Sequence, residues 1–172
     1  MNKPLTFTIF GSTGDLTYRK LLPALIQLET RGLLPEDLVV RCIGRKDIDT
    51  ASYLETAKPW LQKGSRFPFS EEVYARFSKH IRYVKMDMTD AADYAVLNPA
   101  QTDRDYLYYF AVAPEFFESI AQNLKTSGAL NQGNHRIIVG SMKLMPVISI
   151  PSFLRSSMKK TFTASIIILG KK

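Results

Sequence analysis

Short apolar runs alternate with amphipathic stretches along the first 139 residues of the chain. The apolar runs are rich in β-prone residues and predict strands at 5–10, 38–44, 81–87, 105–112 and 135–139. Between them, apolar residues recur three and four positions apart, the spacing that places side chains on one face of a helix. Strands that alternate with helices need crossover connections. The pattern therefore predicts a doubly wound α/β fold with a mostly parallel sheet.

The first predicted helix lies within residues 16–34. Pro23 must stand near its start or kink it, because proline lacks the N–H group that a helix interior needs. Gly32 is the predicted stop. We expect the buried face of this helix to be formed by Leu21, Leu22, Leu25 and Leu28.

The later helices also show end signals. The second is predicted to start at a cap formed by Asp49 or Thr50 and to end near Pro59. The third, in residues 70–80, opens with a serine cap and two acids. A short helix is expected at 90–97. The last predicted helix closes at Gly128 and carries on one face Phe116, Phe117, Ile120 and Leu124.

The charge pattern changes abruptly after Val139. Residues 1–139 hold 17 Lys and Arg against 16 Asp and Glu, whereas residues 140–172 hold six basic residues and no acid. The formal net charge of +7 therefore belongs almost wholly to the tail. We predict a domain boundary here, with one domain at 1–139 and an aberrant tail at 140–172. Basicity confined to the tail, without a nucleic-acid motif, argues against a nucleic-acid-binding protein.

The composition fits a single globular domain of 172 residues, with 45% hydrophobic and 23% charged residues. No apolar run approaches the roughly 18 residues of a membrane span, so we expect no membrane association. The single cysteine, Cys42, excludes an internal disulfide and fits a reducing compartment, which predicts a cytoplasmic protein. Because Cys42 stands inside an apolar run, we expect it to be buried.

A glycine-containing loop separates the first strand from the first helix. Glycine permits a tight turn and a close approach of a pyrophosphate, and the helix N-terminus adds partial positive charge. Thr17 stands where the common dinucleotide fingerprint has a third glycine, so an ordinary turn is the alternative. The predicted pyrophosphate-binding residues are Gly11, Ser12, Thr13, Gly14, Asp15 and Leu16.

The end of the second strand bears on the choice of nucleotide. NAD-selective folds commonly place an acid there, to bind the ribose 2′-hydroxyl. This chain has Arg45 and Lys46 instead. A guanidinium forms charge-assisted hydrogen bonds with a 2′-phosphate, which favours NADP as the cofactor. Asp47 keeps NAD open as a weaker ligand, and a solvated surface pair is the other interpretation.

These motifs together resemble the N-terminal part of glucose-6-phosphate dehydrogenases. FGSTGDLTYRKLLPAL is similar to the family pattern of G-x-x-G-D-L, a basic pair and L-x-P-x-L. The resemblance continues through IGRKD, YFAVAPEFF and HRIIV, and so covers residues 1–139. It implies a Rossmann-like domain and NADP-dependent oxidation of glucose 6-phosphate to the lactone, in the pentose phosphate pathway.

The resemblance also assigns roles to residues. It implies that the glycine loop holds the pyrophosphate and that Arg45, with Lys46 beside it, holds the 2′-phosphate. Lys20 matches a lysine near the substrate end of the cofactor, with a plain exposed helix lysine as the alternative. We expect no metal site. The nicotinamide side is implied to be lined by Ala111, Val112, Ala113 and Pro114.

After Val139 the chain departs from the family. The segment E-K-P-F-G, the motif R-I-D-H-Y-L-G-K-E and the second, α+β domain with its general-base histidine are not found. His80 and His135 match neither histidine of the family. We therefore expect no catalytic residue and no turnover in this chain. Since the family's subunit contact belongs to the second domain, the oligomeric state cannot be inferred.

The tail has a specific explanation. One permissible set of codons for the last fifteen residues, MKKTFTASIIILGKK, reads EEDIYRIDHYLGKE when translated one base earlier. This is the family's substrate motif in another frame, and we infer a shifted reading frame over 140–172. We also expect that SIIILG can be recruited as a strand. The alternative is a free-standing NADP-binding regulatory or interaction module with a native basic tail.

Overall fold

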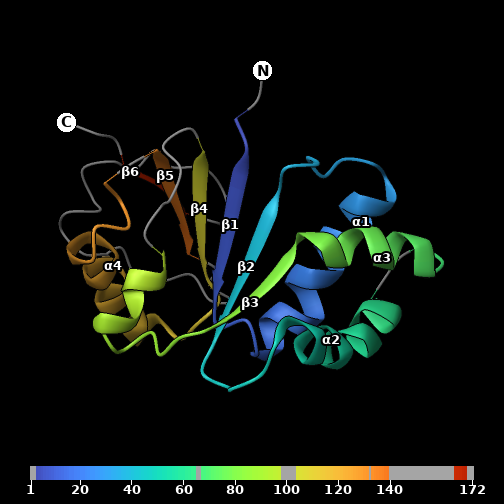
Figure 1. Cartoon of the computed structure of the whole chain (residues 1–172), viewed down its shortest axis with the longest axis horizontal. Helices are drawn as coiled ribbons and strands as arrows, with labels where there is room; N and C mark the ends of the chain where they lie inside the picture. The colour runs from blue at the N-terminus through green and yellow to red at the C-terminus, as the bar shows by residue number, and fades with distance from the viewer. Residues whose placement is uncertain (1–2, 65–66, 98–103, 132, 140–164, 170–172) are drawn as a thin grey trace.

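The structure, a computed structural model, describes residues 3–64, 67–97, 104–131, 133–139 and 165–169. These residues form one six-stranded sheet of strand order β3-β2-β1-β4-β5-β6 (Figure 1). Strands β1 to β5 are parallel, and β6 is antiparallel to β5. The strands are β1 (Leu5–Phe10), β2 (Val39–Gly44), β3 (Ile81–Lys85), β4 (Asp105–Phe110), β5 (Asn134–Val139) and β6 (Ser165–Leu169).

Helices cover the sheet from both sides, as the alternating pattern predicts. In Figure 1, α1, α2 and α3 lie on one side of the sheet and α4 lies on the other. The predicted doubly wound α/β fold is therefore confirmed. The helical elements are η1 (Thr17–Leu21), α1 (Leu22–Thr30), α2 (Thr50–Gly64), α3 (Glu71–His80), η2 (Ala92–Leu97), η3 (Pro114–Phe116) and α4 (Phe117–Thr126).

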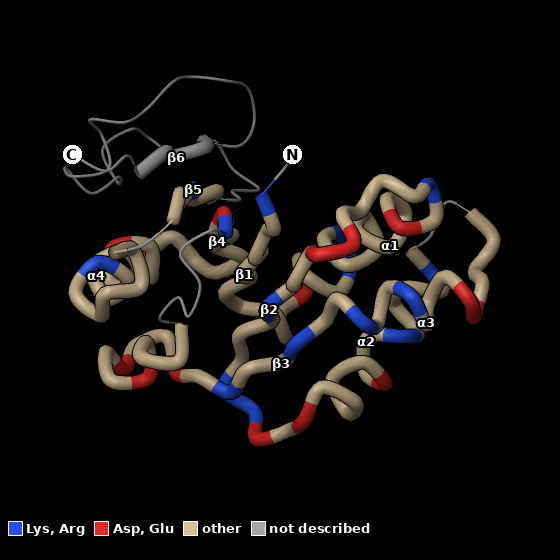
Figure 2. The backbone as a smooth tube through the Cα atoms, turned by 45° about the horizontal axis from the view of Figure 1, so that its top comes forward, with Lys and Arg blue, Asp and Glu red and all other residues tan. Residues whose placement is uncertain are grey.

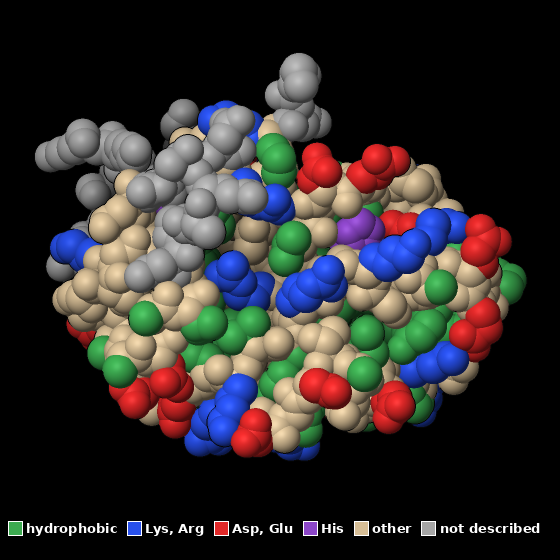
Figure 3. All heavy atoms as spheres, in the orientation of Figure 1, with side chains coloured by type: hydrophobic (Ala, Val, Ile, Leu, Met, Phe, Trp, Pro, Cys, Tyr) green, Lys and Arg blue, Asp and Glu red, His purple; other side chains and the backbone are tan. Residues whose placement is uncertain are grey.

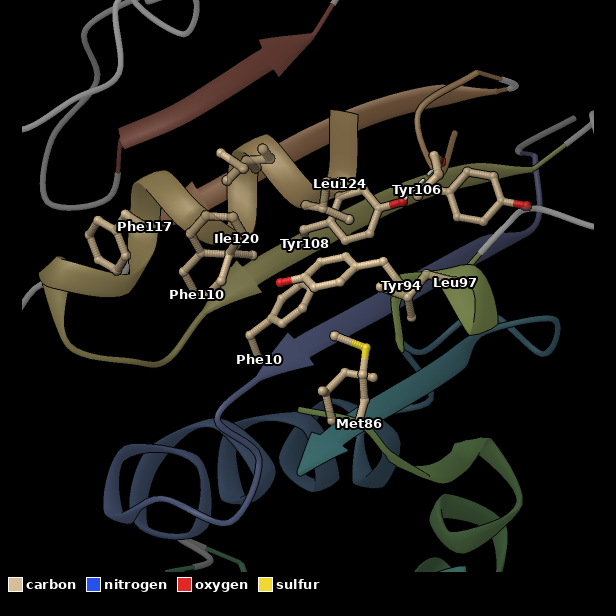
Figure 4. Close-up of a cluster of buried hydrophobic side chains, with 14 residues drawn as sticks. Phe10, Met86, Tyr94, Leu97, Tyr106, Tyr108, Phe110, Phe117, Ile120 and Leu124 are labelled. Atoms are coloured by element: carbon tan, nitrogen blue, oxygen red, sulfur yellow. Dashed lines mark hydrogen bonds between the residues drawn. The ribbon is translucent and has the colours of Figure 1, made fainter. Parts of the chain in front are cut away.

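Each face of the sheet carries its own hydrophobic core. Successive side chains of a strand point to opposite faces, so Ile9 belongs to one core and Phe10 to the other. Under α1, α2 and α3 lie the fully buried Cys42, Tyr53 and Phe77. The core beneath α4 is rich in aromatic rings, and Figure 4 shows many of its members: Phe10, Met86, Tyr94, Leu97, Tyr106, Tyr108, Phe110, Phe117, Ile120 and Leu124.

The predicted apolar face of the first helix is only partly right. Leu22 is buried as expected, but Leu28 is 37% exposed, and the other buried positions of α1 include Ile26 and Glu29. Leu21 and Leu25 flank this face and are half-buried. The buried stripe is thus rotated from the one that an uninterrupted helical period predicts.

A π-helical turn explains this rotation. Residues 15–30 form one continuous helical run, in which Thr17–Leu21 is a π-turn and the Leu22 N–H donates to the Thr17 carbonyl. The wider turn holds an extra residue and so changes the phase of the side chains that follow it. It ends two residues before Pro23, whose ring would clash with the carbonyl four residues earlier in a regular helix. Gly32, at a φ of 65°, follows the helix end, as predicted.

The prediction that the second helix ends near Pro59 is wrong. Helix α2 continues through Pro59 to Gly64. Ala57 and Leu61, on either side of the proline, are both fully buried, and their packing offsets the hydrogen bond that Pro59 cannot donate. At the other end, the Ser52 N–H donates to the Asp49 carboxylate at 2.8 Å, so Asp49 is the cap.

Strand β6 confirms that part of the SIIILG segment is recruited into the sheet. In the antiparallel register with β5, Ser165 lies opposite Val139 and Leu169 opposite His135. Residues 140–164 and 170–172 lie outside the described part of the chain, so the shifted reading frame stays a prediction. Strand β4 ends at Phe110 rather than at 112, which leaves Ala111 and Val112 in the following turn.

Acidic and basic residues are interspersed over the molecule. Figure 2 shows both signs along α1, α2 and α3, and Figure 3 shows both signs on the face in view. This mixture agrees with the near balance of charge that residues 1–139 carry. Among the described residues, no helix is long and apolar enough to cross a membrane.

Candidate functional site

Three turns that the sequence singles out meet at one end of the sheet, where the parallel strands terminate. They follow the carboxyl ends of β1, β2 and β4, which are neighbours in the strand order. The order reverses between β1 and β4, and ligands of doubly wound folds bind in the crevice beside such a switch point. The structure therefore brings together the turns Gly11–Leu16, Arg45–Lys46 and Ala111–Pro114.

The turn after β1 depends on the absence of a side chain at Gly11. This residue has a φ of 82°, in the left-handed region that glycine tolerates. A Cβ atom there would lie 2.5 Å from the Ala111 carbonyl oxygen and 2.8 Å from a methyl group of Val112. The Ala111 N–H also donates to the Phe10 carbonyl at 2.9 Å. The first and third turns are thus in direct contact.

The hydrogen bonds of the glycine loop show which amides it can offer to a ligand. The Ser12 N–H donates to the Ile43 carbonyl and the Gly14 N–H donates to the Gly11 carbonyl, each at 3.0 Å. After Gly11, which directly follows β1, the remaining amides of the loop belong to Thr13, Asp15 and Leu16, where the helical run begins. Such N–H groups lack an intrahelical acceptor and form a natural anion site.

Two hydroxyl groups of this segment behave differently. Thr17, which replaces the third glycine of the common fingerprint, is buried, and its hydroxyl donates to the Gly11 carbonyl at 3.1 Å. This hydrogen bond holds the start of the helical run against the glycine loop. The hydroxyl oxygen of Ser12 is also buried, and it makes no hydrogen bond within the described part of the chain. This orphaned polar atom fits a loop that completes its hydrogen bonds with a ligand.

The charged side chains near the loop are on the surface. Asp15 and Arg19 form an ion pair at 3.4 Å, one helical turn apart. Exposed pairs of this kind contribute little stability. Lys20 is exposed on η1, and it makes no hydrogen bond or ion pair with another described residue. The structure fixes no contact between Lys20 and the three turns.

The turn after β2 exposes both predicted basic side chains, those of Arg45 and Lys46. Asp47, which left the alternative of a ribose hydroxyl open, is ion-paired with Lys85 at 3.0 Å. Asp87 lies in the electrostatic range of Arg45. The pKa of Asp87 is lowered chiefly by hydrogen bonds from Thr89, with a smaller contribution from the guanidinium of Arg45.

Two residues of the site were missed by the sequence analysis. The Tyr53 hydroxyl donates to the Ser12 carbonyl at 2.8 Å, beneath the glycine loop. A Cβ atom on Gly44 would lie 2.6 Å from the Tyr83 hydroxyl oxygen and 3.1 Å from a methyl group of Thr13. Gly44, directly before the basic turn, could have been suspected from its place at a strand end. Tyr53 stands on the apolar face of a helix, where nothing in the sequence marks a hydroxyl partner.

Burial keeps the side chains beneath the loop neutral. It raises the pKa of the Cys42 thiol to about 12, and the fully buried Tyr53 hydroxyl also has a raised pKa, chiefly by burial. Cys42 is therefore a core residue, as its apolar surroundings predict. Within the described ranges, no group of three His, Cys, Asp or Glu side chains is placed to hold a metal ion.

Comparison with known proteins extends this picture. The family profile described as "Glucose-6-phosphate dehydrogenase, NAD binding domain" matches residues 8–141, which include all three turns. Glucose-6-phosphate 1-dehydrogenase of Gluconobacter oxydans is 37% identical over 132 residues, which cover 71% of this chain and 26% of that protein. The enzyme of Leuconostoc mesenteroides is 31% identical over 141 residues, covering 77% and 28%.

Solved structures agree with the sequence relatives. The crystal structure of glucose-6-phosphate 1-dehydrogenase from Mycobacterium avium superposes with a TM-score of 0.72 and 27% identity, covering 81% of this chain and 30% of that one. The chain thus spans between a quarter and a third of the length of these relatives.

Proposed function

The chain belongs to the glucose-6-phosphate dehydrogenase family, and on that premise we propose that residues 1–139 bind NADP in preference to NAD. One observation carries the proposal. The basic turn Arg45–Lys46 lies beside the glycine loop, at the end of a strand where an NAD-selective fold commonly has an acid. A Cβ atom added to Gly44 would lie 3.1 Å from a methyl group of Thr13, so the two turns lie side by side, as binding of one dinucleotide to both would require.

The site supplies each phosphate with a suitable donor. The amides of Thr13, Asp15 and Leu16, at the start of the helical run, would hold the pyrophosphate. The close packing around Gly11 excludes any side chain at this position. A backbone without a side chain can approach a phosphate closely. Arg45 would hold the 2′-phosphate through charge-assisted hydrogen bonds, with Lys46 beside it.

We assign the third turn, Ala111–Pro114, to the nicotinamide side of the cofactor. It begins at Ala111, in contact with Gly11, and runs to Pro114. Its first two residues are half-buried and its last two are exposed. When bound, the cofactor accepts a hydride. We place Lys20 near the substrate end of the cofactor.

For the whole protein, we propose the activity that its relatives are named for: cytoplasmic oxidation of glucose 6-phosphate to the lactone, in the pentose phosphate pathway. We propose that residues 1–172 alone do not complete this reaction, because they include no counterpart of the family's histidine base or of most of its substrate contacts. The expected result is no NADPH formation when purified chain, NADP and glucose 6-phosphate are mixed. NADPH formation that depends on the sugar phosphate, followed by absorbance, would contradict this expectation.

The test of the cofactor site is a titration with NADP and, separately, with NAD. Calorimetry gives the affinities, and the fluorescence of Trp60, the single tryptophan, provides a second signal. Arg45→Ala should weaken NADP binding by about tenfold or more, since a hydrogen bond to a charged group contributes about 1.5–3 kcal/mol. NAD binding should change little, because NAD lacks the 2′-phosphate.

Arg31→Ala is the matched control. Arg31 is an exposed arginine that follows the end of α1, at the opposite end of the sheet from the site because the helix runs back along the strands. It should leave both affinities unchanged. Equal losses of NADP and NAD binding in Arg45→Ala would contradict the assigned role. Failure of the unaltered chain to bind either nucleotide would overturn the proposed function.

The alternative is a free-standing NADP-binding regulatory or interaction module with a native basic tail, which the family match over residues 8–141 does not favour. The two candidates share the nucleotide site and differ in the origin of residues 140–172. The nucleotide sequence of the gene separates them. An intact RIDHYLGKE in the neighbouring frame, with coding sequence beyond it, supports the dehydrogenase. Its absence supports the module.

A further inference from the structure

Four aromatic rings form a row beneath the two phosphate-binding turns. Trp60 stacks on Tyr18 at a centroid distance of 6.3 Å, Tyr18 lies 5.8 Å from Tyr53, and Tyr53 stacks on Tyr83 at 5.0 Å. The row joins α2, η1 and β3. Trp60, at its outer end, is 37% exposed, whereas Tyr53 is fully buried. Such stacked pairs hold their rings in fixed relative positions.

The two inner rings each hold one of the turns. The Tyr53 hydroxyl donates to the Ser12 carbonyl in the glycine loop at 2.8 Å. The Tyr83 hydroxyl donates to the Lys46 carbonyl in the basic turn at 2.9 Å. Because these two rings stack on each other, the aromatic row links both turns to one rigid support.

These hydrogen bonds also set the direction of the next amide. In a trans peptide the C=O and the following N–H point in opposite directions, and the described residues contain no cis peptide. A hydroxyl that holds the Ser12 carbonyl inward therefore aims the Thr13 N–H outward. Thr13 supplies one of the three loop amides that a pyrophosphate can use. By the same geometry, Tyr83 fixes the peptide that follows Lys46, next to Arg45.

We propose that Tyr53 and Tyr83 are positioning residues with different effects: Tyr53 orients the pyrophosphate turn for any dinucleotide, and Tyr83 orients the basic turn and so sets the preference for NADP over NAD. The proposal rests on the cofactor site proposed above. Neither side chain is a catalytic residue, since both act through backbone groups that would touch the cofactor.

The experiment compares three variants that each remove one hydroxyl group. Tyr53→Phe should weaken NADP and NAD by the same factor, about two- to tenfold, as expected for one lost hydrogen bond. Tyr83→Phe should weaken NADP by a similar factor and leave NAD nearly unchanged. Tyr74→Phe is the control, because the Tyr74 hydroxyl donates to the Leu54 carbonyl in α2, away from both turns. It should change neither affinity.

A further variant tests the Tyr83 hydrogen bond without changing Tyr83 itself. In Gly44→Ala the added methyl group would lie 2.6 Å from the Tyr83 hydroxyl and should displace it. This variant should lower the ratio of NADP affinity to NAD affinity as Tyr83→Phe does. The added Cβ would also lie 3.1 Å from a methyl group of Thr13, so both affinities should fall in addition to this change in their ratio. Calorimetric stoichiometry counts the folded, binding-competent fraction in each sample, so partial unfolding is not mistaken for weaker affinity.

The outcomes separate this inference from the proposed function. If the unaltered chain binds neither nucleotide, the proposed function fails, and the inference fails with it. If the chain binds NADP but Tyr83→Phe weakens both nucleotides equally, or neither, the inference is overturned while the cofactor site stands. A loss of NADP preference in Tyr83→Phe and Gly44→Ala, with equal losses in Tyr53→Phe, supports it.

Discussion

At the scale of single residues, two glycines with positive φ allow the cost of backbone strain to be measured apart from the cost of a steric clash. Gly11 has a φ of 82° and touches the Ala111 turn, whereas Gly32 has a φ of 65° and nothing within 4 Å of its added Cβ. Gly32→Ala should cost about 1 kcal/mol of unfolding free energy, for backbone strain alone. Gly11→Ala should cost about 3 kcal/mol, because a steric clash adds to the strain. Urea unfolding of both variants measures the difference, and equal losses would contradict the packing at Gly11.

Cys42 gives a second prediction at this scale. Its thiol is fully buried and its pKa is raised to about 12, so the thiolate is scarce at neutral pH. The folded protein should react with a thiol reagent far more slowly than the protein in urea. The reaction rate should rise along the unfolding transition that circular dichroism reports. Fast labelling of the folded protein would show that the reagent reaches Cys42 and would contradict its burial.

At the scale of elements, the start of α2 should respond to acid. The Ser52 N–H bonds to the Asp49 carboxylate and lowers its pKa below the ordinary value of 3.8. A group with a depressed pKa stabilises the fold above its ordinary value and loses that effect as the pH falls through the folded value. Asp49→Ala should therefore unfold at lower urea than the unaltered chain near neutral pH. The difference between the two urea midpoints should shrink below pH 3.8. A difference that stays constant with pH would exclude a cap that depends on the charge of Asp49.

The elements also show what the sequence predicts well. The number, type and order of the strands and helices before Val139 follow from apolar periodicity. Two of the three turns follow from glycine and basic residues at strand ends, whereas the turn at Ala111–Pro114 was expected only from the family resemblance. The π-turn before Pro23 and the continuation of α2 through Pro59 could not be predicted, because each is decided by packing against other elements. The same holds for Tyr53, since its partner is a carbonyl 41 positions away in the chain.

At the scale of the whole molecule, every described residue of the site precedes Val139 in the chain. All of its turns come from β1, β2 and β4 and their neighbours. A chain that stops after Val139 should therefore keep its far-ultraviolet circular dichroism and bind NADP within about twofold of the complete chain, a change below roughly 0.4 kcal/mol. The complete chain is the control. Loss of folding in the shortened chain would assign β6 a structural role and favour the module with a native tail.

Strand β6 has a consequence for how proteins acquire new sequence. Its pairing with β5 joins backbone groups, which every residue type except proline offers equally. If residues 140–172 are out-of-frame sequence, β6 was never selected for this sheet, and it still finds a register at the open edge. The edge strand of the family's sheet then pairs with a segment that was never part of this fold in its relatives. An accident in a gene can in this way supply raw material on which selection acts.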